Sequence, residues 1–328
     1  MCAHGILGLS ILKLFIMDVS ASSITQPIAQ SLPSALLMFK NAWRNYRDHW
    51  QLFLGIMVIP VLLALPYTLF GEQFVLFSFL SALALVVARP ALFDAVVENG
   101  EPAGGIRGAY RKGLSFFVPF LWVSLLVSLV VFGGFFLFIV PGILLSIWLS
   151  FSLYPLFAEG RHGISALTTS WHYVKGYWGQ VFWRFIVFGI CIFLIAIPFL
   201  ILSGLIDFIG GSVRAPLTRL VNLVFTNFFV LPIGIIYTYI LYQSLKQLKA
   251  QQPPEAEEAK LRTPIIIFAV LGVVGIILIF VLAGFLLAKF GEEFFKAIQS
   301  AETLPVRPSS LLASMGFSPL IDFAHFWR

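Results

Sequence analysis

Residues that could take part in acid–base or metal chemistry are few and scattered along this chain of 328 residues. The five histidines are His4, His49, His162, His172 and His325. Asp48 and His49 are adjacent, but neighbouring side chains of a helix do not face each other and make a poor metal site. Glu159 lies near His162 and His172 in sequence, and we interpret these two histidines as interfacial loop residues.

Motifs of known catalytic sites are also missing from the sequence. It holds no Gly-x-Ser-x-Gly nucleophile elbow, no phosphate-binding Walker loop and no dinucleotide fingerprint. The sequence therefore predicts that the chain is not an enzyme and that it has no catalytic, cofactor-binding or metal-binding residues.

A second set of polar side chains interrupts apolar stretches, where ionisable residues usually mark a transport pathway. These candidate pathway residues are Arg89, Asp94, Arg184, Asn222, Thr226 and Asn227. Arg89 and Arg184 lie near the ends of their apolar runs, so their side chains could instead extend to the headgroups. Asn and Thr commonly join helices by hydrogen bonds. No acidic residue falls at the middle of a run, which disfavours a coupled pump and leaves a facilitator or a lipid flippase as the alternative.

Composition places the chain in a membrane. Hydrophobic residues make up 59% of it and charged residues 11%, against about 45–50% and about 25% in soluble domains. Apolar runs longer than about 18 residues span bilayers, and their continuous rather than alternating pattern indicates helices. The predicted spans are 52–70, 74–97, 114–136, 138–157, 181–206, 220–241 and 264–288. The predicted fold class is therefore all-α, a polytopic helical membrane protein.

Turn residues and polar stretches divide the chain into parts. The predicted parts are an N-terminal segment (1–50, with an interfacial helix at about 34–50), a six-span domain of three hairpins (51–250), a polar linker (251–263), one appended span (264–290) and a tail (291–328). We expect tight hairpins at 71–73 and 133–134, a longer link at 207–219, and a solvated linker. The apolar run in 1–16 is too short to span, so we favour Met17 as the start, with a peripheral apolar arm as the alternative.

Lys and Arg gather at one side of the predicted spans. They are denser in the N-terminal segment, the 98–113 and 158–180 loops and the 246–263 segment than on the other side. The N-terminus is therefore predicted to be cytoplasmic and, after seven spans, the C-terminus to lie outside. This asymmetry accounts for the net charge of +6, so we predict no nucleic-acid partner.

An aromatic repeat precedes the first span of each predicted hairpin. The aromatic pairs, seven positions apart, are Trp43/Trp50, Tyr110/Phe117 and Trp171/Trp178, and the basic residues between them include Arg47, Arg111 and Lys175. Seven residues make nearly two helical turns, so each pair is predicted to share one face of a helix. The repeat predicts three cytoplasmic amphipathic helices whose aromatics lie at the headgroups and whose basic groups contact phosphates. The simpler alternative is that these segments only anchor the spans.

Motifs of a known family occur in 139–178 and at the end of the sixth span. They are Val140-Pro141-Gly142 opening a span, the turn Glu159-Gly160, the segment from Ala166-Leu167 to Trp178, and Leu241-Tyr242 followed by Lys246. Over about residues 34–250 the chain resembles uncharacterised six-span bacterial membrane proteins that are similar to the membrane domain of glycerophosphoryl diester phosphodiesterase, with the YciC family as a relative. The resemblance implies a bacterial inner-membrane address and an architecture. It implies no reaction, because the His, Glu and Asp cluster that such a diesterase needs is missing from the sequence.

The sequence thus favours an integral membrane protein of structural or organising type that acts on lipid or on a membrane partner. The expected partners are membrane lipids, and a membrane protein or a second copy of this chain is a further candidate. Transport along the candidate pathway residues is the alternative function.

Overall fold

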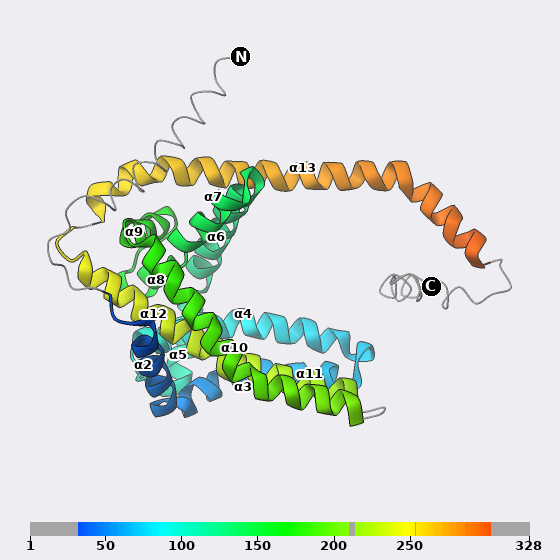
Figure 1. Cartoon of the computed structure of the whole chain (residues 1–328), viewed down its shortest axis with the longest axis horizontal. Helices are drawn as coiled ribbons and strands as arrows, with labels where there is room; N and C mark the ends of the chain where they lie inside the picture. Colours follow the sequence, from blue (N-terminus) through cyan, green and yellow to red (C-terminus); the bar gives the residue numbers. More distant parts are fainter. Residues whose placement is uncertain (1–31, 210–213, 253, 303–328) are drawn as a thin grey trace, which may run out of the picture. The chain divides into compact units, whose positions relative to one another are not determined.

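The described part of the protein is built from helices. The structure, a computed structural model, describes residues 32–209, 214–252 and 254–302 (Figure 1). Its helices are α2 (Ala35–Asp48), α3 (Trp50–Phe70), a 3₁₀ turn (Glu72–Phe74), α4 (Val75–Val97), α5 (Gly105–Ser115), α6 (Phe117–Leu137), α7 (Ile139–Trp148), α8 (Leu153–Glu159), α9 (Ile164–Val174), α10 (Trp178–Ile209), α11 (Arg214–Val224), a π-helical segment (Phe225–Val230), α12 (Leu231–Leu248) and α13 (Glu255–Glu302). Within the described residues, seven helical stretches are long and apolar enough to cross a membrane. The predicted all-α, polytopic membrane fold is therefore confirmed.

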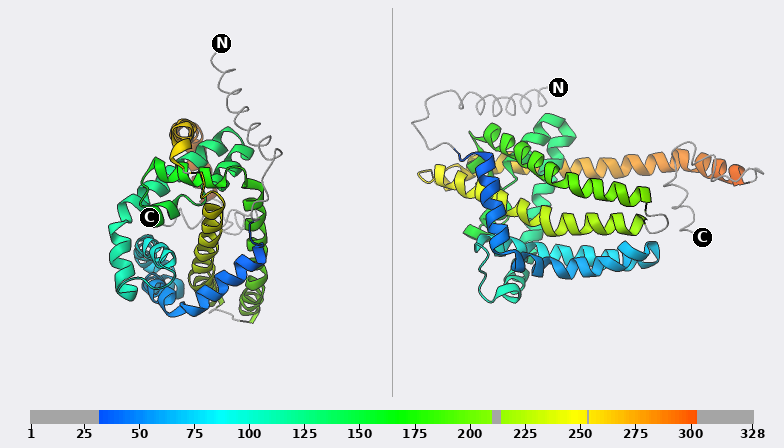
Figure 2. Two further views of the ribbon diagram at one scale, coloured as in Figure 1. Left: turned by 90° about the vertical axis from the view of Figure 1, so that its left-hand side faces the viewer. Right: turned by 60° about the horizontal axis from the view of Figure 1, so that its bottom comes forward.

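A short helix followed by a helical hairpin occurs three times along the chain. The short helices α2, α5 and α9 precede α3, α6 and α10. The hairpin arms that pack on each other are α3 with α4, α6 with α7, and α10 with α11. α2 runs across the hairpin ends and packs on α12, α10 and α3 (Figure 2). The turn between α3 and α4 is tight because Gly71 adopts a positive φ of 81° just before the 3₁₀ turn.

The aromatic pairs of the repeat do not share one helical face, because the chain breaks between their members. Trp50, Phe117 and Trp178 are the first residues of α3, α6 and α10. The helices before two of them, α2 and α5, are followed by His49 and Phe116, whose backbone angles are not helical. The first aromatic of each pair therefore belongs to a short helix and the second opens a span. The prediction that each aromatic pair shares one helical face is therefore wrong. The two members of a pair are seven positions apart because they lie on either side of the break between a short helix and the span that follows it.

Gly133 and Gly134 do not form the hairpin turn predicted for them. They lie inside α6, and the chain turns at Phe138, whose extended backbone (φ −161°, ψ 159°) separates α6 from α7. The glycines instead permit close helix contacts. A Cβ on Gly133 would lie 2.0 Å from the Phe268 carbonyl oxygen of α13, and one on Gly134 would lie 3.0 Å from the Gly142 Cα atom of α7. The two glycines therefore allow neighbouring helices to pack closely and do not form a hairpin turn.

The fourth predicted span is broken inside the protein into α7 and α8. Residues 149–152 between the two helices form turns, and buried backbone groups there need hydrogen-bond partners. Ser170 of α9 supplies two of them. The Phe151 amide donates to the Ser170 hydroxyl oxygen (3.2 Å), and this hydroxyl donates to the Trp148 carbonyl oxygen (2.7 Å). A side chain of the third repeat thus stabilises a break in the second.

The sixth span also departs from a regular helix. The π-helical segment joins α11 to α12, and the Asn227 side chain donates to the Leu223 carbonyl oxygen (2.9 Å) beside it. α10 continues to Ile209 and α11 begins at Arg214. The long link predicted at 207–219 is therefore confined to 210–213, which lie outside the described residues.

Residues 255–263 of the predicted solvated linker are helical, and Lys260 and Arg262 among them are exposed. α13 begins at Glu255, directly after Pro254, and continues through the predicted appended span to Glu302. Ala, Glu, Lys, Leu and Arg dominate its first turns and are strong helix formers. Proline is also well tolerated where a helix begins. Most of the segment between the sixth and seventh spans is thus a helical extension of the seventh.

The chain divides into two compact units, Met1–Gly272 and Val273–Arg328. In the second unit, the large apolar side chains described between Val273 and Phe290 are exposed, except for the half-buried Ile276. A helix that is apolar on all sides is expected where lipid surrounds it. The predicted apolar arm (1–16) and the end of the predicted tail (303–328) lie outside the described residues.

Replacing Gly133 by alanine is expected to lower the thermal stability of the protein in detergent micelles. The new Cβ would overlap the Phe268 carbonyl oxygen, and overpacking costs about 1–3 kcal/mol. Gly189→Ala in α10 is the matched control, because a Cβ there meets nothing within 4 Å. We expect the control to keep or raise the unfolding temperature. An unfolding temperature of Gly133→Ala equal to that of the unaltered protein would show that α6 and α13 do not pack at this position.

Candidate functional site

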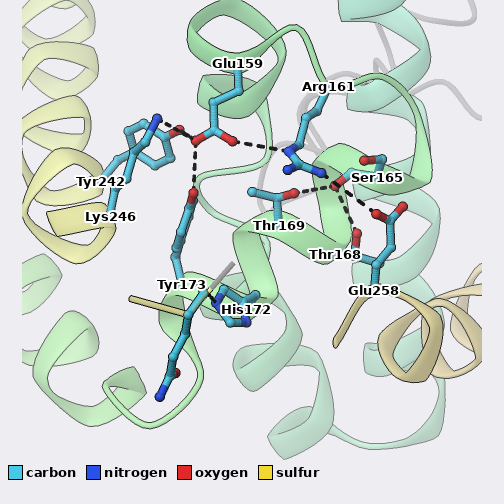
Figure 3. Close-up of polar contacts among 11 residues, drawn as sticks. Glu159, Arg161, Ser165, Thr168, Thr169, His172, Tyr173, Tyr242, Lys246 and Glu258 are labelled. Atoms are coloured by element: carbon cyan, nitrogen blue, oxygen red, sulfur yellow. Dashed lines mark hydrogen bonds and ion pairs between the residues drawn. The ribbon is translucent and has the colours of Figure 1, made fainter. Parts of the chain in front are cut away.

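One partly buried carboxylate, Glu159 at the end of α8, collects polar groups from neighbouring helices (Figure 3). Its side chain is 12% exposed. The Tyr173 and Tyr242 hydroxyls donate to Glu159 Oε1 at 3.0 and 2.5 Å. Lys246 Nζ lies 2.9 Å from the same oxygen, and Arg161 Nε lies 3.2 Å from Oε2. We call these five residues the Glu159 cluster, and it joins α8 to α9 and α12.

A second polar cluster ties the start of α13 to α9. His172, which is 2% exposed, contacts Glu257 Oε2 through Nδ1 at 2.9 Å. Lys175 Nζ lies 3.2 Å from Glu257 Oε1. We call these three residues the His172 cluster. The interpretation of His172 as an interfacial loop residue is therefore wrong, because the segment 158–180 contains the buried helix α9.

Arg161 connects the Glu159 cluster to the start of α13. It pairs with Glu159, and its Nη1 atom lies 3.8 Å from Glu258 Oε2 of α13. Both oxygens of Glu159 are engaged, so the arrangement holds helices together and offers no free carboxylate for proton transfer. Within the described residues, no three His, Cys, Asp or Glu side chains are placed to share a metal ion.

A fully buried carboxylate, Asp94, lies near the end of α4. Asp94 is 1% exposed, and Lys112 Nζ of α5 lies 2.9 Å from its Oδ1 atom. Lys112 also pairs with Glu98. Burial lowers the pKa of Lys112, but the hydrogen bonds and charges of Glu98 and Asp94 outweigh this effect and raise its pKa, so it stays charged. A cavity of about 330 Å³ lies beside this pair, and Arg111 also lines it.

The candidate pathway residues do not meet in one place. Arg89 is exposed on α4, and Asn222 and Thr226 are exposed on the sixth span. Arg184 is buried and donates to two carbonyl oxygens of the segment before α2, at 2.9 Å each. Of this set, only Asp94 lines the cavity. The structure therefore separates these residues into an exposed group, an anchor for the N-terminal segment and one buried ion pair.

The first aromatic of each repeat has a different environment. Trp43 is 38% exposed on α2. Tyr110 of α5 is half-buried, and its hydroxyl donates to a carbonyl oxygen of α3 at 2.6 Å. Trp171 is buried and stacks on Trp148 with ring centroids 4.4 Å apart. All of α9 from Ala166 to Val174 is buried. The prediction that α9 is an interfacial helix is wrong, because it packs against α7, α8 and α12.

The remaining residues of the aromatic repeat divide in the same way. Trp50 is 48% exposed, whereas Phe117 and Trp178 are half-buried at the starts of their spans. Arg47 and Arg111 are exposed, and Lys175 belongs to the His172 cluster. The surface-facing members of the repeat therefore come mainly from the first two units.

Sequence reasoning missed that Tyr173, Tyr242 and Glu257 would bind charged partners. A signal was present, because Glu159, Tyr242 and Lys246 all belong to the motifs quoted above. Those motifs are up to 87 positions apart in sequence, and the structure brings them into one cluster. The burial of Glu159 could not be read from a sequence that places it in a turn.

No known protein family, curated protein or solved structure matches the chain. The class of protein is therefore assigned from the fold alone. The chain is a multi-pass helical membrane protein with seven stretches, among the residues described, that can span a bilayer.

Replacing Glu159 by glutamine is expected to destabilise the protein. Lys246 and Arg161 would lose a charged partner, and an unsatisfied buried group costs about 1–3 kcal/mol. Asp48→Asn is the control, because Asp48 pairs with Arg47 at 3.7 Å on the exposed surface, where such pairs contribute about 0–1 kcal/mol. Thermal unfolding in one detergent measures both. Loss of equal size in the two variants would contradict the role given to Glu159.

Proposed function

We propose that this chain is an integral protein of a bacterial cytoplasmic membrane that organises lipid at the cytoplasmic surface, with α2 as its main lipid-contacting element. The outward side of α2 combines exposed apolar and exposed basic side chains, and this observation carries the proposal. The exposed residues are Leu36, Leu37, Lys40, Trp43, Arg44 and Arg47. A helix with this combination lies in the bilayer interface, where apolar groups enter the acyl boundary and basic groups contact phosphates.

The inward side of α2 fixes which face points outward. Met38, Ala42 and Tyr46 recur every four residues and are buried against the six-span domain. The Tyr46 hydroxyl donates to the Phe228 carbonyl oxygen of the π-helical segment at 2.8 Å. Burial raises the pKa of Tyr46, so the phenol keeps the proton that it donates. α2 is thus held by the body of the protein while its basic and apolar face remains free.

α5 repeats this arrangement on a smaller scale. Ile106 and Leu114 are exposed apolar residues, and Arg107 and Arg111 are exposed basic residues on the same short helix. Tyr110 anchors α5 to α3 through its hydroxyl. Two of the three short helices therefore support a lipid-contacting role, and α9 is the internal member of the set.

Transport is less well supported than lipid organisation. A pathway needs its polar residues to line one passage, whereas Arg184 anchors backbone carbonyls and Asn222 and Thr226 are exposed on a span. Glu159 and His172 are engaged in their clusters, so the proposal includes no catalytic step. Membrane lipids are the proposed partners. We also propose that the chain is related to the six-span bacterial family that it resembles.

The proposed topology predicts which turns face the cytoplasm. With Cys2 and Cys191 replaced by serine, Glu101→Cys in the turn before α5 should react with an impermeant maleimide only from the cytoplasmic side of sealed vesicles. Gln73→Cys, in the turn between α3 and α4, is the matched control and should react only from the opposite side. Labelling in the reverse pattern would overturn the proposed orientation.

Lys40, Arg44 and Arg47 are expected to give the protein a preference for anionic lipid. Each basic residue near an anionic surface contributes about 1 kcal/mol, so replacing all three by glutamine should lower the preference by about two orders of magnitude at most. The full chain is reconstituted with equal phosphatidylglycerol and phosphatidylcholine, and mass spectrometry measures the lipid retained on purification. Arg219→Gln is the control, because Arg219 lies beside Gly71 at the other end of the hairpins. An unchanged lipid ratio in the triple variant would contradict the proposal.

A further inference from the structure

The imidazole of His172 lies between two hydrogen-bond acceptors from residues 252–257, the segment in which α13 begins. Its Nδ1 atom is 2.9 Å from Glu257 Oε2, and its Nε2 atom is 3.0 Å from the Gln252 carbonyl oxygen. A neutral imidazole has one N–H donor and one acceptor nitrogen, whereas the protonated ring has two donors. If Glu257 is ionised, both contacts are therefore hydrogen bonds only while the ring is protonated.

Lys175 favours the ionised form of Glu257. Its Nζ atom lies 3.2 Å from Glu257 Oε1, and an ammonium at this distance stabilises a charged carboxylate. A protonated Glu257 could donate to a neutral ring, but Lys175 would then lose its charged partner. His172 is 2% exposed, so a ring nitrogen that loses its protein partner is poorly hydrated, and this is costly.

The charges closest to His172 oppose one another. The Lys249 ammonium donates to the His172 carbonyl oxygen, and Lys175 lies on the far oxygen of Glu257. Both ammonium groups disfavour a positive ring, whereas Glu257 stabilises it. The Tyr173 ring contacts the imidazole edge-on, with centroids 5.7 Å apart, and adds no charge. The protonated state of the ring therefore depends on Glu257.

The other helices around α9 bring no further charge to the ring. α6, α7, α8 and α12 pack on α9, and α6 and α7 contain no titratable side chain. Tyr242 and Lys246 of α12 contact Glu159 of α8, and Glu258 of α13 lies beside Arg161 (Figure 3). Among the described residues, Glu257 is thus the one carboxylate that contacts the imidazole.

We propose that His172 is a pH-dependent latch, whose protonated ring holds residues 252–258 on α9 and whose deprotonation releases them. Deprotonation leaves a ring lone pair facing an acceptor oxygen, so one of the two contacts becomes repulsive. The attached state binds the proton more tightly than the released state, so attachment strengthens as the pH falls and weakens as it rises. Leu261 and Ile265 of α13 are buried in the apolar core, so release is confined to the start of α13. This latch goes beyond the proposed function, which depends on α2.

Distance measurement by electron paramagnetic resonance tests the latch in the full chain in nanodiscs. With Cys2 and Cys191 replaced by serine, spin labels are attached to Asp48→Cys and Gln251→Cys, two exposed positions. Histidine changes charge between about pH 5 and about pH 8, so we expect a narrow distance distribution at the lower pH and a broad one at the higher. The ratio of attached to released molecules should fall about tenfold or more, which is the effect of one hydrogen bond to a charged group.

Two substitutions are expected to abolish this pH response. His172→Gln places an amide that does not titrate between the two acceptors. Glu257→Gln provides a side chain that can accept from the protonated ring and donate to the neutral one, so attachment becomes independent of pH. His162→Gln is the matched control, because it removes an exposed histidine just before α9, and it should respond as the unaltered chain does.

A distance distribution in the unaltered chain that is the same at both pH values would overturn the proposal. A pH response that persists in Glu257→Gln, or one that disappears in His162→Gln, would also overturn it. Glu257→Gln keeps the test decisive if His172→Gln fails to fold, because Glu257 is half-buried at the start of α13 and not in the apolar core.

Discussion

A carboxylate placed among apolar helices must be paired, because an isolated buried charge costs several kcal/mol. Glu159 is paired by Tyr173 of α9 and Tyr242 of α12, together with two basic side chains. This requirement positions α9 inside the protein. Once α9 is there, Ser170 reaches the break between α7 and α8, and His172 faces the start of α13. The broken span, the buried short helix and the ordered start of the seventh span all depend on the same carboxylate.

The number and type of the membrane helices could be predicted, because the length of an apolar run is a local property that lipid enforces directly. The environment of α9 could not be predicted from aromatic spacing. That spacing is the same whether the aromatic residues meet headgroups or other helices, as Trp43 and Trp171 show. A useful distinction was nevertheless present. α2 contains Lys40, Arg44 and Arg47, whereas Ile164–Val174 contains no lysine, arginine or carboxylate.

The candidate site was partly visible in the sequence. Asp94 was identified as a polar residue in an apolar run, and Glu159 as part of a turn motif. Their partners could not be identified, because Lys112 and Lys246 lie 18 and 87 positions further along the chain. Local sequence does not encode such pairings, which depend on how the hairpins pack. The glycine pair of α6 was misread for a related reason, since Gly133 serves a contact with α13 that lies far from it in sequence.

The basic residues that indicate topology perform two different tasks in the structure. One group is paired with carboxylates of the protein: Lys112, Arg161, Lys175 and Lys246. In each of these pairs a neighbouring carboxylate offsets the charge of the basic side chain. Another group is exposed, pairs with no described carboxylate and lies next to exposed apolar groups: Lys40 and Arg44 of α2 and Arg107 and Arg111 of α5. A positive-inside count therefore overstates the charge available to lipid, and the lipid-contacting role proposed for α2 rests on basic residues such as Lys40 and Arg44, which no described carboxylate pairs with.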